Sequence, residues 1–175
     1  LPKIVTPEFS TTLPSTGEEI FFRPFLVKEE KILLMAQEGK DPHEIQRAII
    51  NILEDCIKTP LSVSTLPLFD IEWLFLQLRS KSVGEVIEVN LLHKENPECG
   101  HPNKISIPIK EIHVYKPDKH SDIITVDEAT GIGIKMKYPS LDMYSKIDLK
   151  SQSYAQVFDV ICESVDSVFD KEQVY

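Results

Sequence analysis

The sequence predicts an α+β fold, because its helical and strand-like segments are segregated along the chain. Apolar residues recur about every 3.6 residues in the first half, and the period changes to two after Gly84. Helices and strands that follow one another in blocks favour a small antiparallel sheet over a doubly wound one. We expect an extended arm over residues 1–19 and a single α+β domain over residues 20–175, helical at 26–82, mainly β at 84–139 and helical again at 140–170.

The N-terminal segment is rich in Pro, Ser and Thr, which favours an extended arm with a turn at Ser15–Glu18. The aromatic run Ile20–Phe25 follows, and Pro24 near its end predicts a short strand at a sheet edge. An arm of this kind can wrap a neighbouring protein by adding a strand to it. The alternative is a terminus without fixed structure.

Two helices are predicted next, the first over about Lys28–Glu38 with Gly39 as its stop. The second begins at Asp41, which can accept hydrogen bonds from the first amides of the helix. Pro42 then suits the first helical position, and Glu44 stands at the capping-box position. The apolar stripe of this helix consists of Ile45, Ile49, Ile52, Leu53 and Cys56.

A third helix, roughly Phe69–Lys81, has almost no polar face, which predicts that it is buried or covered by a partner chain. Alternation with a period of two then predicts a hairpin formed by residues 85–92 and 104–114. A second hairpin is predicted from Ile124–Val126 and Ile132–Tyr138. These two hairpins make up the predicted antiparallel sheet.

The C-terminal part is predicted to be helical again. Ser140 can cap a short helix that ends near Lys146, and a long amphipathic helix is expected over about Ser151–Phe169. The face opposite its apolar stripe carries a row of carboxylates. We interpret this acidic row as a docking face for a basic partner or, alternatively, as a solvated helix face. The row consists of Asp159, Glu163, Asp166 and Asp170.

The composition is that of an acidic globular protein. The 175 residues include 19 Lys and Arg against 28 Asp and Glu, so the formal net charge is −9. We therefore expect neither a nucleic-acid partner nor binding to an anionic membrane. No apolar stretch is long enough to span a bilayer. The three cysteines are widely spaced, which argues against a disulfide framework and fits a reducing cytoplasm.

The sequence lacks the motifs that are typical of an enzyme. It contains no Gly-x-Ser-x-Gly nucleophile elbow and no phosphate-binding loop. The pair Gly131 and Gly133 lacks a third glycine and falls in a predicted hairpin. Neighbouring carboxylates such as Glu54 and Asp55 do not face each other on a helix. We therefore expect no catalytic residues and no organic cofactor.

One cluster has the chemistry of a metal site. His93, Cys99 and His101 lie in the connection between the first two predicted strands, and a thiolate with two imidazoles can bind zinc. The alternative is a polar hairpin loop with an incidental cysteine. A structural zinc site needs a fourth ligand, and the remaining candidates are Cys56, Cys162 and His113.

Several segments of the sequence are distinctive: Pro14–Gly17, Phe22–Phe25, Val27–Lys31, Leu66–Glu85 and Met136–Ser140. Together and in this order they resemble the baseplate protein family of T-even-like, contractile-tailed bacteriophages, in particular its baseplate hub assembly members. The resemblance covers nearly the whole chain, and Leu66–Glu85 is its most specific part. It implies a late viral protein, present in the host cytoplasm during assembly and then in the virion tail, that binds other tail proteins.

From this resemblance we expect a structural or assembly component of the baseplate hub that acts by protein–protein binding and not as an enzyme. One alternative is a transient chaperone that binds the tape-measure or hub proteins and is absent from the mature virion. The other is a zinc-stabilised binding module. Besides the acidic row, the predicted contact patch is aromatic and consists of Phe21, Phe22, Phe25 and Trp73.

Overall fold

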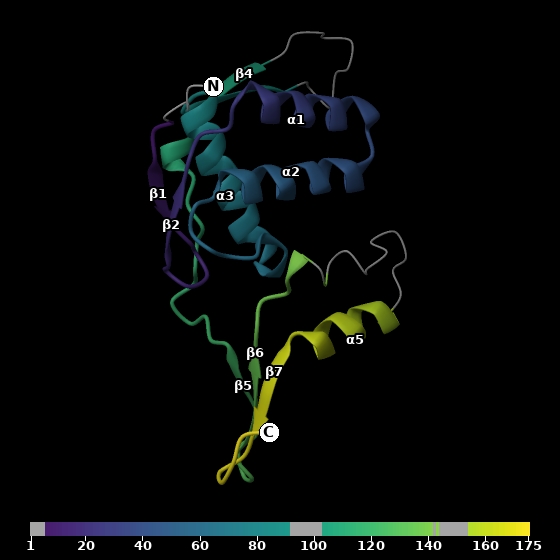
Figure 1. Cartoon of the computed structure of the whole chain (residues 1–175). Helices are drawn as coiled ribbons and strands as arrows, with labels where there is room; N and C mark the ends of the chain where they lie inside the picture. The colour runs from purple at the N-terminus through teal and green to yellow at the C-terminus, as the bar shows by residue number, and fades with distance from the viewer. Residues whose placement is uncertain (1–5, 92–102, 142, 144–153) are drawn as a thin grey trace. The chain divides into compact units, whose positions relative to one another are not determined.

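The computed structural model describes residues 6–91, 103–141, 143 and 154–175. Its helices and small antiparallel sheets confirm the predicted α+β class (Figure 1). The chain groups into two compact units, each of which is described by itself. Unit 1 comprises Leu1–Val63 and Phe69–Val114, and unit 2 comprises Ser64–Leu68 and Tyr115–Tyr175. The single domain expected over residues 20–175 stays a prediction.

Unit 1 begins with a hairpin where the sequence predicted an extended arm. Strand β1 (Phe9–Thr12) pairs antiparallel with β2 (Glu19–Phe22). The turn between them is closed by a hydrogen bond of 2.9 Å from the Leu13 amide to the Glu18 carbonyl, and the Leu13 side chain is only 2% exposed. The described part of the predicted arm, residues 6–19, is therefore half of a hairpin that contributes to the core.

Three helices pack beside this hairpin, at the positions that the sequence predicted: α1 (Val27–Gly39), α2 (Pro42–Cys56) and α3 (Leu68–Ser82). The Asp41 side chain accepts a hydrogen bond of 2.9 Å from the His43 amide, which confirms the predicted start of α2. Gly39, the predicted stop, is the last residue of α1, and Lys40 caps the helix with a left-handed φ of 55°. The core between these elements includes Ile20, Ile52, Leu53, Val63, Ile71, Leu74 and Leu78.

A buried carboxylate joins β2 to α1. The Glu29 side chain is 1% exposed, and its oxygens accept hydrogen bonds of 3.0 Å from Arg23 and 2.9 Å from the Leu26 amide. Burial would raise the pKa of Glu29, but these hydrogen bonds outweigh it and hold the pKa below the usual value of 4.5. Glu29 is therefore ionised and fully engaged at neutral pH.

A second buried carboxylate joins the β1–β2 turn to α3. Asp70 is fully buried and accepts a hydrogen bond of 3.1 Å from the Ser15 amide, together with a bond from the Ser15 hydroxyl. Burial raises the pKa of Asp70, although the two bonds from Ser15 lower it in part. Trp73 donates a hydrogen bond of 3.1 Å to the Thr11 hydroxyl one turn further along α3. Polar contacts thus fasten both the strand and the turn of the hairpin to α3.

A two-stranded ribbon completes unit 1. Strand β3 (Val86–Leu91) pairs antiparallel with β4 (Asn103–Pro108), as the sequence predicted. The short helical turn η3 (Ile109–Glu111) follows, and it brings Ile109 into the core at 2% exposure. The Ile109 amide also donates a hydrogen bond of 2.8 Å to the Glu85 carbonyl at the base of the ribbon.

Unit 2 contains a three-stranded antiparallel sheet in the order β5-β6-β7 (Figure 1). Strands β5 (Ile123–Asp127) and β6 (Ile132–Met136) form the predicted second hairpin. Strand β7 (Val165–Phe169) comes from a segment that the sequence predicted to be helical. Helix α5 (Tyr154–Glu163) precedes it, and the short helix predicted over 140–146 lies mostly outside the described residues.

The predicted last helix is too long because the chain leaves it at Ser164. This buried serine ends α5 with bonds from its amide and hydroxyl to the Val160 carbonyl, of 2.9 and 2.7 Å. Its own carbonyl accepts a hydrogen bond of 2.8 Å from the Lys137 amide, which directs the chain onto β6. The Phe169 ring then lies against Gly133, where a Cβ atom would come within 2.3 Å of the ring.

The buried ion pair provides the first test of this fold. We expect Glu29→Gln to lower the free energy of unfolding by about 3 kcal/mol, because it leaves a largely buried guanidinium without its partner. Since folding lowers the pKa of Glu29, its stabilisation is present above pH 4.5 and is lost as the pH falls through the lower folded value. Urea unfolding of both proteins from pH 7 to pH 3 measures this difference, which should shrink in acid.

Lys28→Ala, at an exposed side chain, is the control and should change stability by less than about 0.5 kcal/mol. An equal loss from both substitutions would contradict the assignment.

The contact between Gly133 and Phe169 provides a second test. Gly133→Ala should lower the melting temperature, because the new methyl group has to displace the Phe169 ring, at a cost of about 1–3 kcal/mol. The double variant Gly133→Ala/Phe169→Ala should show less than the sum of the two single losses, because the clash no longer exists. Strictly additive losses in calorimetry would mean that the two residues do not touch.

Candidate interaction surface

The predicted zinc ligands His93, Cys99 and His101 lie outside the described residues, so the zinc site stays a prediction. Within the described part of the chain, no three His, Cys, Asp or Glu side chains gather as a bound metal ion would require. Of the candidate fourth ligands, Cys56 is fully buried, and burial raises its pKa to about 11. Without a metal beside it, a thiol with this pKa stays protonated at neutral pH.

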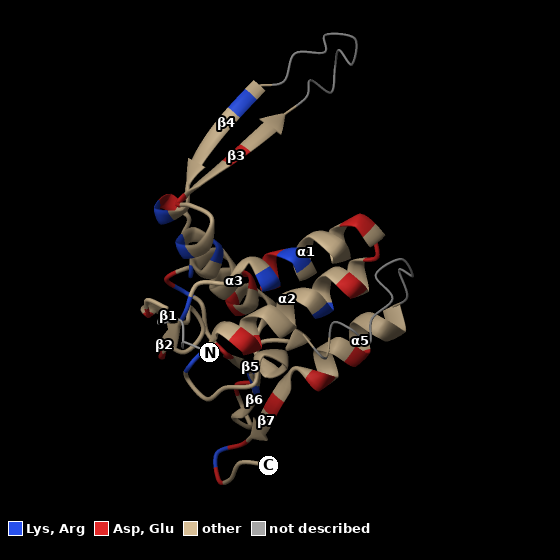
Figure 2. Ribbon diagram, turned by 45° about the horizontal axis from the view of Figure 1, so that its top comes forward, with Lys and Arg blue, Asp and Glu red and all other residues tan. Residues whose placement is uncertain are grey.

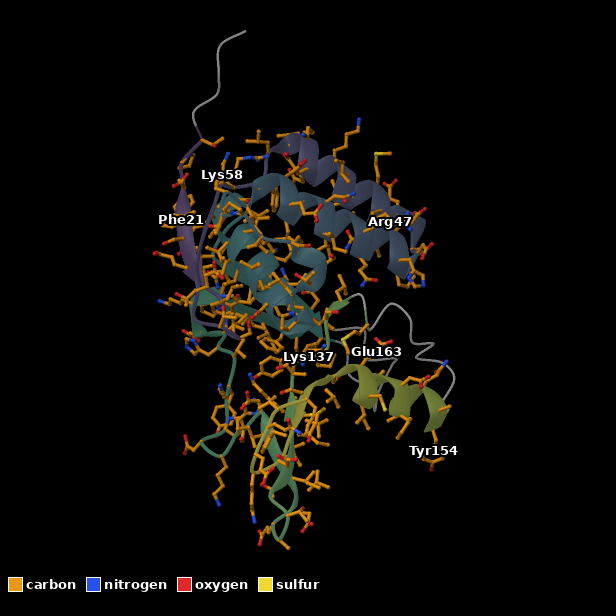
Figure 3. All side chains as sticks on the ribbon, turned by 60° about the horizontal axis from the view of Figure 1, so that its bottom comes forward. Phe21, Arg47, Lys58, Lys137, Tyr154 and Glu163 are labelled. Carbon is orange, nitrogen blue, oxygen red and sulfur yellow. The ribbon has the colours of Figure 1, made fainter. Side chains whose placement is uncertain are left out.

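The predicted aromatic patch is divided between the core and the surface of unit 1. Phe22 and Phe25 are 3% and 9% exposed, so they belong to the core, which corrects the prediction that they form part of an exposed patch. Phe22 is the last residue of β2, and Phe25 lies between that strand and α1. Trp73 is half-buried and bonded to Thr11, and Phe21 is the member of this set that is exposed. Figure 3 shows Phe21 on the outer side of the β1–β2 hairpin.

The predicted acidic row does not form a single helix face. Asp159 and Glu163 lie on α5, whereas Asp166 lies on β7 and Asp170 follows that strand. Asp166 is 3.6 Å from the Lys135 ammonium group, and the Asp170 carboxylate accepts hydrogen bonds from the amides of Glu172 and Gln173. The segment from Tyr154 to Asp170 nevertheless has no Lys or Arg, so all its charged side chains in Figure 2 are acidic.

Unit 2 buries few of its apolar side chains. Among the described residues, all the buried apolar side chains except Leu141 and Met143 belong to unit 1. Unit 2 instead exposes large apolar residues on its sheet, on its helix and near its C-terminal end. Groups of exposed large apolar side chains are typical of binding sites. We therefore take the apolar surface of unit 2 as the candidate site.

One face of the three-stranded sheet forms the first part of this surface. Ile124, Ile134 and Val168 stand opposite one another across the three strands, so their side chains share a face. Ile124 and Val168 are exposed and Ile134 is half-buried. Ile132 extends the same face along β6, because residues two apart on a strand point the same way.

Helix α5 forms the second part, and it is turned with its apolar stripe outward. Tyr154, Val157, Phe158 and Ile161 follow the spacing of one helix face and are 93%, 58%, 65% and 53% exposed. The less exposed positions, Gln156 and Val160, lie on the opposite side of the helix. Figure 3 shows Tyr154 at the far end of α5 and Glu163 at the end that leads into β7. A helix in this orientation offers an apolar ridge to another molecule.

The ribbon of unit 1 presents a comparable but smaller apolar face. Ile87 faces Ile107 and Val89 faces Ile105 across the two strands, so four aliphatic side chains lie on one side of the ribbon. Ile105 and Ile107 are exposed, and the other two residues are half-buried. An isolated two-stranded ribbon is only marginally stable in water. This face therefore gains stability from any partner that covers it.

A model of the family described as T4 bacteriophage base plate protein matches residues 6–175 of the chain. The match includes every described residue of both units. No curated protein and no solved structure matches the chain. In the described residues, no helix is long and apolar enough to cross a membrane.

The outward orientation of α5 can be tested in the purified protein. Phe158→Asp should change the free energy of unfolding by less than about 0.5 kcal/mol, because the side chain it replaces is already in water. Leu74→Ala, at a buried position of α3, should lose about 2–5 kcal/mol in the same denaturant titration. A loss of several kcal/mol from Phe158→Asp would show that the stripe is covered within the protein itself.

Proposed function

The chain belongs to the T4 bacteriophage base plate protein family, and we propose that it is a structural component of the baseplate hub of a contractile-tailed phage. In this role it binds other tail proteins and catalyses no reaction. The observation that carries the proposal is the apolar surface of unit 2, which includes the outward stripe of α5. An exposed apolar surface of this kind is suited to a permanent assembly, in which a partner covers it.

The character of this surface supports a lasting contact over a passing one. Permanent interfaces are more apolar than transient ones and resemble a domain core that has been divided between two chains. The sheet face and the α5 stripe have this character, because Ile124, Val168, Phe158 and Ile161 are all large, apolar and exposed. Aromatic residues such as Phe158 are also typical centres of binding energy.

A transient assembly chaperone is the second candidate, and the charge of α5 and β7 favours it. Asp159 is exposed, and the segment from Tyr154 to Asp170 has no basic residue to offset its carboxylates. Contacts of these carboxylates with a basic surface of a partner would form fast and weaken with salt, and the tape-measure protein is one candidate for that partner. In this case the protein would occupy the host cytoplasm during assembly and leave before the virion is complete.

The two candidates differ in whether the chain stays in the particle. Tails purified from a phage that produces this protein should contain it at a fixed copy number by quantitative mass spectrometry. Complete tails without the chain would exclude the structural role and support the chaperone.

Substitution of the α5 stripe should separate binding from folding. When a phage lacking the gene is complemented in trans, Phe158→Asp should reduce the yield of infectious particles at least tenfold, because a buried carboxylate without a partner opposes the contact. Ala155→Asp adds the same charge to the same helix outside the stripe and should support normal yields. If both variants complement equally, the α5 stripe has no part in assembly.

A further inference from the structure

The two outer strands of the unit 2 sheet, β5 and β7, differ in whether another segment pairs with their outer edges. The outer edge of β7 is closed by the chain itself, because Val168 and Tyr175 exchange hydrogen bonds of 3.1 and 2.6 Å between their amides and carbonyls. A bridge between Phe169 and Val174 continues this closure. Strand β5 pairs only with β6 in the described residues, so no strand covers its outer edge, which is open beyond the groups of Ile123 that the Ser121 hydroxyl occupies.

The backbone of β5 can be followed residue by residue along this open edge. The Ser121 hydroxyl contacts both the amide and the carbonyl of Ile123, at 3.1 and 3.3 Å, so these two groups point away from β6. In an antiparallel pair, inward and outward residues alternate. Ile124 therefore bonds to β6, and the amide and carbonyl of Thr125 point outward again.

The side chains of β5 do not protect this edge. Natural edge strands are commonly shielded by Lys, Pro or an inward-pointing charge. The run Ile123–Val126 has none of these, and all four side chains are exposed. Three of the four residues are β-branched isoleucine or valine and the fourth is threonine, which are the residues that best accept a neighbouring strand.

Carboxylates stand at both ends of the open edge. Asp122 precedes β5, Asp127 ends it and Glu128 follows. Two cations lie near these ends: Lys135 stands opposite Ile123 on β6, and Lys171 donates a hydrogen bond of 2.7 Å to the Ala129 carbonyl in the turn. Hydrogen bonds from the Thr130 hydroxyl and the Ala129 amide lower the pKa of Asp127, which keeps it charged. In an antiparallel pair of two copies, Asp122 of one copy would face the Asp127–Glu128 end of the other. Like charges opposite each other disfavour that pairing.

From the open edge and its acidic ends, we propose that β5 accepts an extended, β-branched segment of another protein that carries Lys or Arg at its ends. The backbone of Thr125 supplies the central hydrogen bonds, and Asp122 pairs with a basic residue of the added strand. This inference rests on the proposed function, since it describes how one partner is held. It also adds what the apolar surface alone does not define, namely the charge and conformation of that partner.

The test uses a synthetic peptide, Lys-Val-Thr-Val-Thr-Lys with blocked ends, as the probe. Titration into the isotope-labelled full chain at low salt should shift the amide signals of Ile123–Val126 in a saturable manner. Thr125→Pro should abolish binding, because it removes an outward N–H without removing a bond to β6. The matching peptide with Glu at both ends should bind more weakly to the unsubstituted protein.

A charge reversal keeps the test decisive even if Thr125→Pro fails to fold. Asp122→Lys should weaken binding of the Lys peptide about threefold and strengthen binding of the Glu peptide, as expected for an exposed ion pair. Glu172→Lys makes the same charge change beside the closed edge and should leave both affinities unchanged.

Three results would overturn the proposal. The first is an absence of peptide binding by the folded protein, and the second is binding that shifts α5 or the sheet face and spares β5. The third is a dimer in sedimentation that Thr125→Pro converts to a monomer, since a second copy would then occupy the edge. None of these results bears on whether purified tails contain the chain, so the proposed function is judged separately.

Discussion

Burial of apolar side chains stabilises a folded chain, and the described residues of unit 2 bury few of theirs. The three-stranded sheet of this unit and its helix α5 each expose an apolar face. In the role that we propose, a partner covers the stripe of α5 and the row through Ile124, Ile134 and Val168. The role that we propose in a larger assembly follows from this deficit.

Unit 1 has a core of its own, and two buried carboxylates anchor the elements around it. Glu29 and Asp70 are both buried, but only Glu29 has a cationic partner, in Arg23. Asp70 depends on Ser15 alone among the described residues, which ties the β1–β2 turn to α3 by neutral donors. Buried polar groups of this kind favour one arrangement of the elements around them, because any other arrangement leaves them without hydrogen bonds.

The elements that local chemistry determines were predictable from the sequence, and those that depend on distant contacts were not. Asp41 and Pro42 define the start of α2 without reference to the rest of the chain. Val165 and Val168 also continue a helical spacing, but pairing with β6, together with the bond from Lys137 to Ser164 and the contact of Phe169 with Gly133, makes that segment a strand. The apolar stripe of α5 was likewise visible in the sequence, but no local pattern tells whether such a stripe points inward or outward. Phe22 was misassigned for the same reason.

The late position of β7 has a consequence for the order in which the protein folds. Strand β6 meets β5 across a short turn at Asp127–Gly131, so this pair can form as soon as both segments have been synthesised. The other neighbour of β6 is β7, which lies far along the chain, since Gly133 pairs with Phe169. Contacts of such long range form slowly. During translation, β6 is therefore exposed for an interval on the side that β7 will occupy, and nascent chains crowded on one messenger RNA are at risk of pairing with each other before the sheet is complete.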